Sequence, residues 1–99
     1  QVMALKNAQK RYLRGLTHAL NPVVMVAERG LAPSVMKEIE IALAHHELIK
    51  VRIGAADRAA RDALVAELLA ATGAELVHGI GHVVSIWRRN DEQPKIELP

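Results

Sequence analysis

The stretch HHELIKVRIG, residues 45–54, contains the clearest strand signal in the chain. From Ile49 onward apolar and basic residues alternate, and successive side chains of a strand point to opposite faces of a sheet. We therefore expect a strand that ends at Ile53, buries its apolar side chains and presents Lys50 and Arg52 on the other face.

The chain before this strand predicts two further elements. Apolar residues recur at helical spacing over about residues 33–45, and Pro33 suits the first turn of a helix, where its missing N–H is not needed. Residues 23–26 are a short run of β-favouring residues between Pro22 and Gly30, which predicts a buried strand.

An amphipathic helix is expected over residues 4–19. Its apolar residues recur every three or four positions, at Leu5, Ala8, Tyr12, Leu16 and Ala19. The helix must end before Pro22, because the residue preceding a proline is pushed out of the helical region. A third helix is expected after Asp57, which can cap its N-terminus, and Gly73 is a suitable C-terminal stop.

The last elements predicted are two strands, over residues 75–80 and 83–88, joined by a tight turn at residues 81–82. Residues 90–99 are expected to be an extended tail. The order is α-β-α-β-α-β-β. The first two crossovers through helices favour parallel pairing, whereas the last pair must be antiparallel. We therefore predict one compact two-layer α/β domain over residues 4–99, with a mixed four-stranded sheet.

Composition narrows the functional classes. The 99 residues contain no cysteine, which excludes disulfides, thiolate zinc sites and cysteine nucleophiles and fits a cytoplasmic protein. No segment reads as a signal peptide or a membrane span. The net charge is only +2, and Tyr12 and Trp87 are the only aromatic residues among Phe, Trp and Tyr, so a nucleic-acid contact would depend mainly on phosphate.

Basic residues are concentrated near the N-terminus. Lys6, Lys10 and Arg14 lie four residues apart, so they share one face of the expected helix. Such a face can follow a nucleic-acid backbone, although a solvated surface is the commoner role of charges on a helix. Further basic residues lie on expected strands, at Lys50 and Arg52 and at Arg88 with its neighbour Arg89.

The segment Ala27-Glu28-Arg29-Gly30 joins an expected strand to a helix. Unpaired N–H groups and the helix dipole favour an anion at such a place, Arg29 adds positive charge, and Gly30 permits a tight turn. Two interpretations remain open: a phosphate clamp, or an ordinary turn with an exposed arginine.

The sequence offers no constellation for catalysis or metal binding. His45 and His46 are adjacent, so on a helix they point about 100° apart, and the H-E-x-x-H pattern is absent. Walker motifs, dinucleotide fingerprints and nucleophile elbows are also absent. We expect a non-enzymatic protein without a metal, a cofactor or a small-molecule substrate.

Three segments match a known pattern: LKNAQKRYLRGLTHALNPVVMV, GLAPSVMKEIEIALAHHELIKVRI, and TGAELVHGIGHVVSIWRR followed by KIELP. They resemble the CRM family (chloroplast RNA splicing and ribosome maturation domain), most closely its bacterial single-domain YhbY-like members. The resemblance covers nearly the whole chain, from about Leu5 to Pro99. Its most specific part is HHELIKV after a helix that begins with GL.

The resemblance implies a compact α/β domain similar to the C-terminal domain of translation initiation factor three, and it implies RNA binding. Bacterial members are associated with precursors of the large ribosomal subunit, so structured ribosomal RNA and the pre-ribosomal large subunit are the expected partners. The family carries a GxxG-type loop, like the loop with which KH domains clamp RNA backbone. That loop maps onto residues 27–30.

The chain departs from the family pattern in and near this loop. Ala27 stands at the first glycine, and Glu28 at a position that is often basic. If that glycine needs a positive φ, alanine would cost on the order of 1 kcal/mol. Ala32 stands at a usual threonine, and the loss of this N-cap would weaken the helix by about 1 kcal/mol.

Two functional hypotheses follow. In the first, the protein binds ribosomal RNA in precursors of the large subunit through phosphate contacts. The expected contact residues are Lys6, Lys10, Arg14, Ala27, Glu28, Arg29, Gly30, Lys50, Arg52 and Arg88. In the second, the protein is an interaction adaptor on assembling ribosomes with weak intrinsic RNA affinity. Salt dependence separates them, because phosphate contacts weaken steeply as salt rises.

Overall fold

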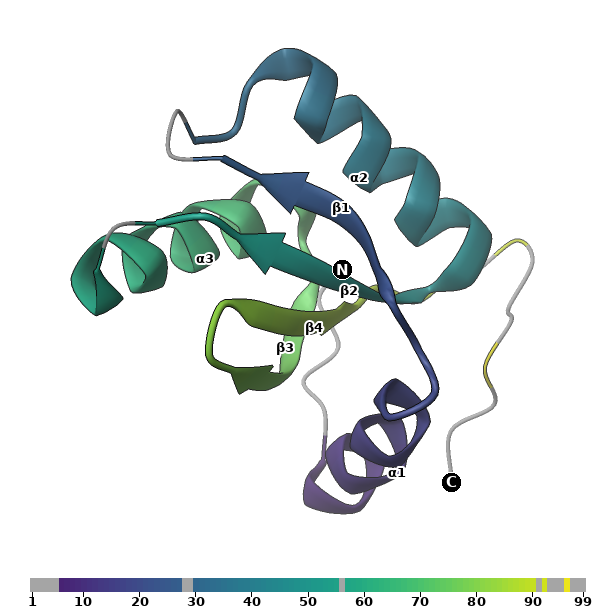
Figure 1. The fold of residues 1–99 in the computed structure, drawn as a ribbon. Coiled ribbons are helices and arrows are strands. Elements are labelled where there is room, and N and C mark those ends of the chain that lie inside the picture. The colour runs from purple at the N-terminus through teal and green to yellow at the C-terminus, as the bar shows by residue number, and fades with distance from the viewer. Residues whose placement is uncertain (1–5, 28–29, 56, 91, 93–95, 97–99) are drawn as a thin grey trace.

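A computed structural model of the protein describes residues 6–27, 30–55, 57–90, 92 and 96. The elements follow one another in the expected order (Figure 1), as α1 (Asn7–Thr17), β1 (Pro22–Val26), α2 (Pro33–His46), β2 (Leu48–Ile53), α3 (Arg58–Thr72), β3 (Glu75–Ile80) and β4 (Val83–Trp87). Within the described ranges, no helix is both long enough and apolar enough to span a lipid bilayer.

The four strands form one mixed sheet in the order β1-β2-β4-β3. β1 pairs with β2 in parallel, and β4 pairs antiparallel with both β2 and β3. The parallel pairing predicted through the first helical crossover is therefore confirmed, and so is the terminal hairpin. β2 and β3 run in the same direction, but they are not neighbours because β4 folds back between them.

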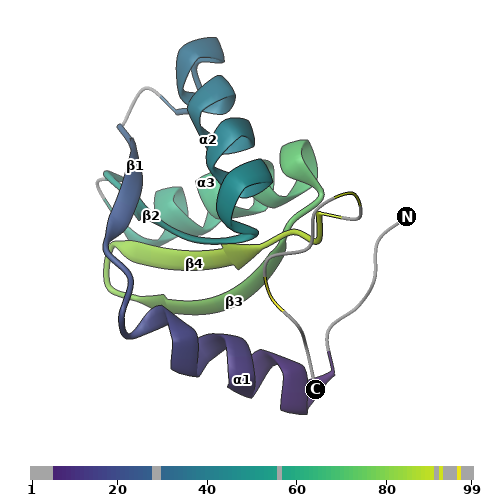
Figure 2. The same cartoon turned by 90° about the vertical axis from the view of Figure 1, so that its right-hand side faces the viewer.

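Helices cover both faces of the sheet (Figure 2). α2 and α3 pack over the main core, to which they contribute Ile39, Leu43, Val65 and Leu68. α1 lies on the opposite face over a smaller cluster made of Leu13, Leu48, Val77 and Trp87. The expectation of two layers was therefore wrong. An amphipathic pattern shows that a helix packs on something, but not on which face of the sheet it does so.

β2 serves both cores. Its alternation is confirmed, because Ile49, Val51 and Ile53 are buried in the main core. Leu48 points the other way, into the small cluster under α1. Arg52, further along the same face, is exposed and lies outside that cluster.

The buried stripe of α1 differs from the expected one. Leu13 and Thr17 are buried, whereas Tyr12, expected in the stripe, is 44% exposed. Thr17 can be buried because its hydroxyl donates a hydrogen bond of 2.6 Å to a main-chain carbonyl one turn earlier. A search for regularly spaced apolar residues does not find a polar residue that is buried because its hydroxyl is hydrogen-bonded within its own helix. Leu5 lies outside the described residues.

β1 is an edge strand with one open face, so the expected strand is confirmed but its burial holds for one face only. Val24 and Val26 are buried against α2, but Val23 is 50% and Met25 57% exposed. A continuous apolar run is typical of a strand covered on both faces, and here only the face toward α2 is covered.

Helix ends follow the local chemistry of the sequence. Asp57 accepts a hydrogen bond of 2.8 Å from the Ala60 N–H, as predicted for an N-cap, and Gly73 ends α3 in the left-handed conformation (φ 73°). α2 begins with Pro33 in its first turn, and Ala32 occupies the N-cap position without a side-chain hydrogen bond. The predicted loss of a cap at Ala32 is confirmed.

Glu47 connects α2 directly to β2 and holds the tail. Its side chain is fully buried and its backbone has a positive φ of 61°. The carboxylate accepts the Asn90 N–H at 2.6 Å and the Ile96 N–H at 2.7 Å. The described residues of the expected tail are therefore attached to the α2–β2 junction.

Candidate nucleic-acid interface

α1 presents a line of basic side chains to solvent. Lys10 and Arg14 are exposed one helical turn apart, and His18 follows at the same spacing directly after the helix. Lys6 is exposed at the N-cap, where its N–H donates to Gln9 Oε1 at 3.0 Å. Because one turn of helix advances about 5.4 Å, these side chains form a continuous ridge along the edge of the molecule.

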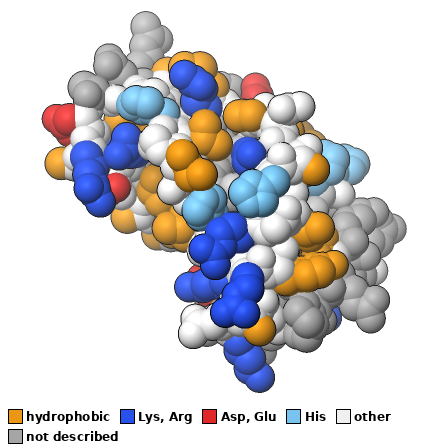
Figure 3. Space-filling view, turned by 60° about the horizontal axis from the view of Figure 1, so that its bottom comes forward, with side chains coloured by type: hydrophobic (Ala, Val, Ile, Leu, Met, Phe, Trp, Pro, Cys, Tyr) orange, Lys and Arg blue, Asp and Glu red, His pale blue; other side chains and the backbone are white. Residues whose placement is uncertain are grey.

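The part of the sheet that α1 leaves uncovered continues this ridge. Lys50 is half-buried and Arg52 is exposed on β2, and Met25 of β1 lies beside Arg52 in the pairing. Figure 3 shows Lys and Arg side chains along this side of the molecule, with His and hydrophobic side chains between them and few acidic ones. We call the surface formed by Lys6, Lys10, Arg14, Lys50 and Arg52 the basic face.

A β-bulge shapes the far edge of this surface. The pairing of β3 with β4 shifts register, so that Leu76 lies opposite Ile86 but His78 lies opposite Ser85. Two consecutive residues, Val77 and His78, consequently point to the same face of the sheet. Val77 enters the small cluster under α1, and His78 lies next to it where the sheet is open.

A pocket of about 320 Å³ lies where the end of α1 meets the open sheet. Its polar lining includes His18 after α1, Asn21 before β1, and one residue from each of the other three strands, Lys50, His78 and Ser85. Lys50 is thus the residue of the basic face that reaches into the pocket.

Ala27 directly follows β1, at the end of that strand remote from α1 (Figure 1). The Gly30 N–H donates to the Ala27 carbonyl at 2.9 Å, which closes a tight turn, and Gly30 has a φ of 89°. Ala27 does not have a positive φ, so alanine is not strained here and the conditional cost does not arise. Glu28 and Arg29 lie outside the described residues, and their contacts with RNA stay predictions.

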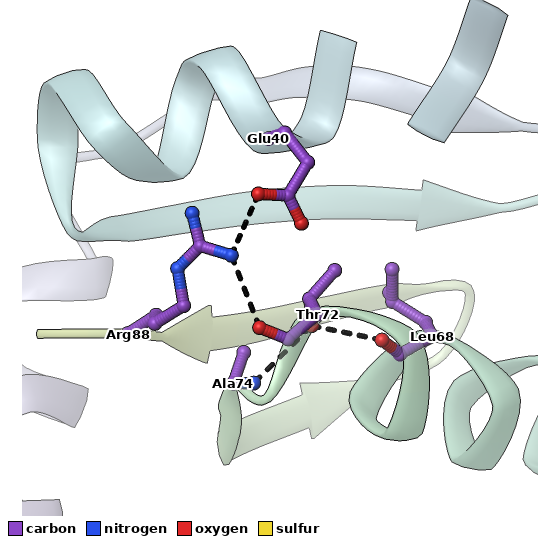
Figure 4. A network of polar contacts seen from close by, with 5 residues as sticks. All are labelled: Glu40, Leu68, Thr72, Ala74 and Arg88. Atoms are coloured by element: carbon purple, nitrogen blue, oxygen red, sulfur yellow. Dashed lines mark hydrogen bonds and ion pairs between the residues drawn. The ribbon is translucent and has the colours of Figure 1, made fainter. Parts of the chain in front are cut away.

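The Arg88 side chain connects the end of β4 to two helices (Figure 4). Its Nη1 donates to Glu40 Oε1 at 2.8 Å and to the Thr72 carbonyl at 3.0 Å. Since Trp87 points toward α1, the next side chain points to the other face, between the ends of α2 and α3. Arg88 therefore points away from the basic face and is not counted in it, and its expected contact with RNA stays a prediction.

The histidines at the end of α2 do not form part of a metal cluster in the described structure. His45 and His46 are both exposed, and their ring centroids lie 6.2 Å apart. Among residues 6–27, 30–55, 57–90, 92 and 96, no three His, Asp or Glu side chains are grouped so that they could hold a metal ion.

Of the polar pocket residues, sequence reasoning named Lys50 and missed the others. His18 carried a usable signal, because it continues the four-residue spacing of the basic ridge. His78 and Ser85 carried none, since a bulge and a strand register bring them together. Tyr12 was expected in the core, but its exposure places an aromatic ring at the surface of α1.

Comparison with known proteins supplies the family. The family model described as the CRS1 / YhbY (CRM) domain matches residues 5–88. A Haemophilus influenzae protein named as an RNA-binding protein is 45% identical over 95 residues, which is 96% of this chain and 95% of the relative. A Pseudomonas aeruginosa protein named as a probable RNA-binding protein is 43% identical and covers 94% of this chain and 89% of its own length.

The fold is shared with a solved structure. A Staphylococcus aureus protein, whose solution structure is described as that of a candidate RNA-binding protein, superimposes with a TM-score of 0.83 at 36% identity. The match covers 97% of this chain and 100% of the other. The α/β order and mixed sheet expected from the sequence thus recur in that protein.

Proposed function

Since the chain belongs to the CRS1 / YhbY (CRM) domain family, we propose that it binds RNA and that its target is structured ribosomal RNA in precursors of the large ribosomal subunit. Its relatives are named as RNA-binding proteins. This activity requires neither a cofactor nor a membrane, and it would take place in the cytoplasm.

The continuity of the basic face carries the proposal. The ridge of α1 leads onto Lys50 and Arg52 without an intervening acid in residues 6–27. Phosphate contacts of this kind fix a protein on an RNA without reading its sequence, and structured RNA is recognised largely by shape and backbone. The contacts assigned to the basic face and to the loop at residues 27–30 are part of the proposal.

Charge reversal tests this surface. Lys10, Arg14 and Arg52 would be replaced together by glutamate, and binding to a structured ribosomal RNA fragment would be measured at low salt. We expect affinity to fall by more than about tenfold, because three attractive charges become repulsive. Lys37→Glu, on an exposed position of α2 in the other layer, is the matched control and should change affinity by less than about twofold. Equal affinity of the triple variant and the control would reject the basic face.

One observation favours the adaptor as a second candidate. Met25 and Ile80 are 57% and 65% exposed on the same side of the sheet, and exposed apolar side chains often mark protein contacts. A protein contact made by these residues would respond little to salt, whereas RNA binding through phosphates weakens steeply. A double variant with Met25→Ser and Ile80→Ser would abolish such a protein contact. It would leave the salt-dependent part of RNA binding unchanged.

A further inference from the structure

We propose that the pocket between the end of α1 and the open sheet binds one unpaired nucleotide of the RNA, with the base inside the pocket and the phosphate at its rim. The inference rests on the proposed function, since it states which part of an RNA this site recognises. The pocket volume of about 320 Å³ lies at the lower end of the range of about 300 to 1,000 Å³ typical of small-ligand sites.

The walls of the pocket suit a flat, partly apolar group. Ile80, Val83 and Leu20 supply an apolar lining, and Ile80 is left 65% exposed. His18 and His78 line the same pocket from α1 and β3. Unpaired RNA bases are commonly held by stacking on aromatic side chains, histidine included.

Ser85 and Asn21 add hydrogen-bonding groups to the pocket. Ser85 is only 2% exposed as a residue, and it lines the pocket from β4. A serine hydroxyl can both donate and accept a hydrogen bond, and the edge of a base offers both donors and acceptors. Asn21, exposed at the rim, can donate and accept as well.

Charge connects the pocket to the basic face. Lys50 belongs to both, and His18 continues the line of Lys10 and Arg14 to the rim. An RNA strand that follows this ridge would bring its phosphates to the pocket entrance. A paired base remains stacked in its helix, so only a bulged or looped-out nucleotide could enter.

Three RNA hairpins with the same stem test the inference. One is fully paired, one has a single bulged uridine, and one has an abasic nucleotide at the bulge. We expect the protein to bind the uridine bulge roughly tenfold more tightly than either of the others, which is the size of effect that one stacked base produces. Equal affinity for the uridine and abasic bulges would overturn the inference. Failure to bind any of the three at low salt would instead reject the proposed function.

Substitutions in the pocket test whether the preference for the bulged uridine arises there. His78→Ala and Ser85→Ala should each reduce the tenfold preference to about threefold or less while affinity for the paired hairpin stays unchanged. Ile80→Asp is a second test of the pocket, and it should also reduce the preference for the bulged uridine. The Ile80 side chain is so exposed that this substitution should not unfold the protein. Ile41→Asp is its matched control, since Ile41 is 50% exposed on α2 and far from the pocket lining. Full preference for the uridine bulge in both His78→Ala and Ile80→Asp would show that the base binds elsewhere.

Discussion

The Arg88 guanidinium donates to the Glu40 carboxylate at 2.8 Å, and so fastens the end of β4 to α2. The same nitrogen reaches the Thr72 carbonyl at the end of α3, so one side chain joins three elements. The Arg88 side chain is 28% exposed, which separates this ion pair from a fully solvated one. Because its guanidinium is engaged in the fold, we expect Arg88 to contribute little to RNA binding.

Arg88→Ala should lower the free energy of unfolding by about 1 to 2 kcal/mol, because two hydrogen bonds from a charged donor are lost. Urea denaturation measures this change. Arg58→Ala is the control, since the Arg58–Asp62 pair is 3.9 Å long with side chains 86% and 70% exposed, and its loss should cost less than about 0.5 kcal/mol. RNA affinity should be unchanged in both variants, and a large loss of affinity in Arg88→Ala would return Arg88 to the binding surface.

Glu47→Ala should destabilise the protein by about 2 to 4 kcal/mol, since the buried carboxylate accepts two main-chain N–H groups of the tail. Hydrogen exchange should show that the amides of Asn90 and Ile96 lose protection. Glu47→Gly separates the carboxylate from the backbone: glycine tolerates the positive φ, so this variant should be about 1 kcal/mol more stable than Glu47→Ala. If Glu47→Gly were more stable than the wild type, backbone strain and not tail attachment would dominate at this position.

Ala32→Thr should raise the stability of the protein by about 0.5 to 1 kcal/mol. Ala32 already has the extended N-cap conformation (φ −67°, ψ 155°), so a threonine hydroxyl can cap α2 without a change of backbone. Thermal denaturation of this variant, compared with Ala32→Val as a β-branched residue that cannot cap, measures the effect. Equal stability of the two variants would mean that the helix start gains nothing from a cap.

Glu28→Lys should raise affinity for structured RNA, by roughly threefold to tenfold at low salt, if the loop at residues 27–30 contacts phosphate. Arg29→Glu should have the opposite effect. Ala27→Gly should change affinity little, because Ala27 is not in a conformation that favours glycine. Filter binding of the three variants checks these expectations, and an unchanged affinity in all of them would confine the interface to α1 and the open sheet.

Local chemistry made much of the fold predictable. The alternation around Val51 predicts a strand. Asp57 and Gly73 mark the two ends of α3, each through a hydrogen bond to a residue three or four positions away in the sequence. Such signals need no knowledge of distant parts of the chain. The family resemblance added the loop at residues 27–30, which no periodicity distinguishes from an ordinary turn.

The remaining features depend on contacts between distant residues. Thr17 is buried because its hydroxyl bonds to its own helix, and the side of the sheet on which α1 lies is decided by packing against Trp87 and Val77. The pocket required the bulge that aims His78 at the same face as Val77. Arg88 and Glu40 are 48 residues apart in the sequence, so their pairing could not be read from spacing.

The salt dependence of RNA binding tests the central claim most directly. If the five residues of the basic face each neutralise one phosphate, the logarithm of the affinity should fall against the logarithm of salt concentration with a slope of about −3.5, at about 0.7 per contact. Replacing Lys10, Arg14 and Arg52 by alanine should make the slope shallower by about 2 units. A slope near zero, or an unchanged slope in the triple variant, would contradict an RNA interface on this face.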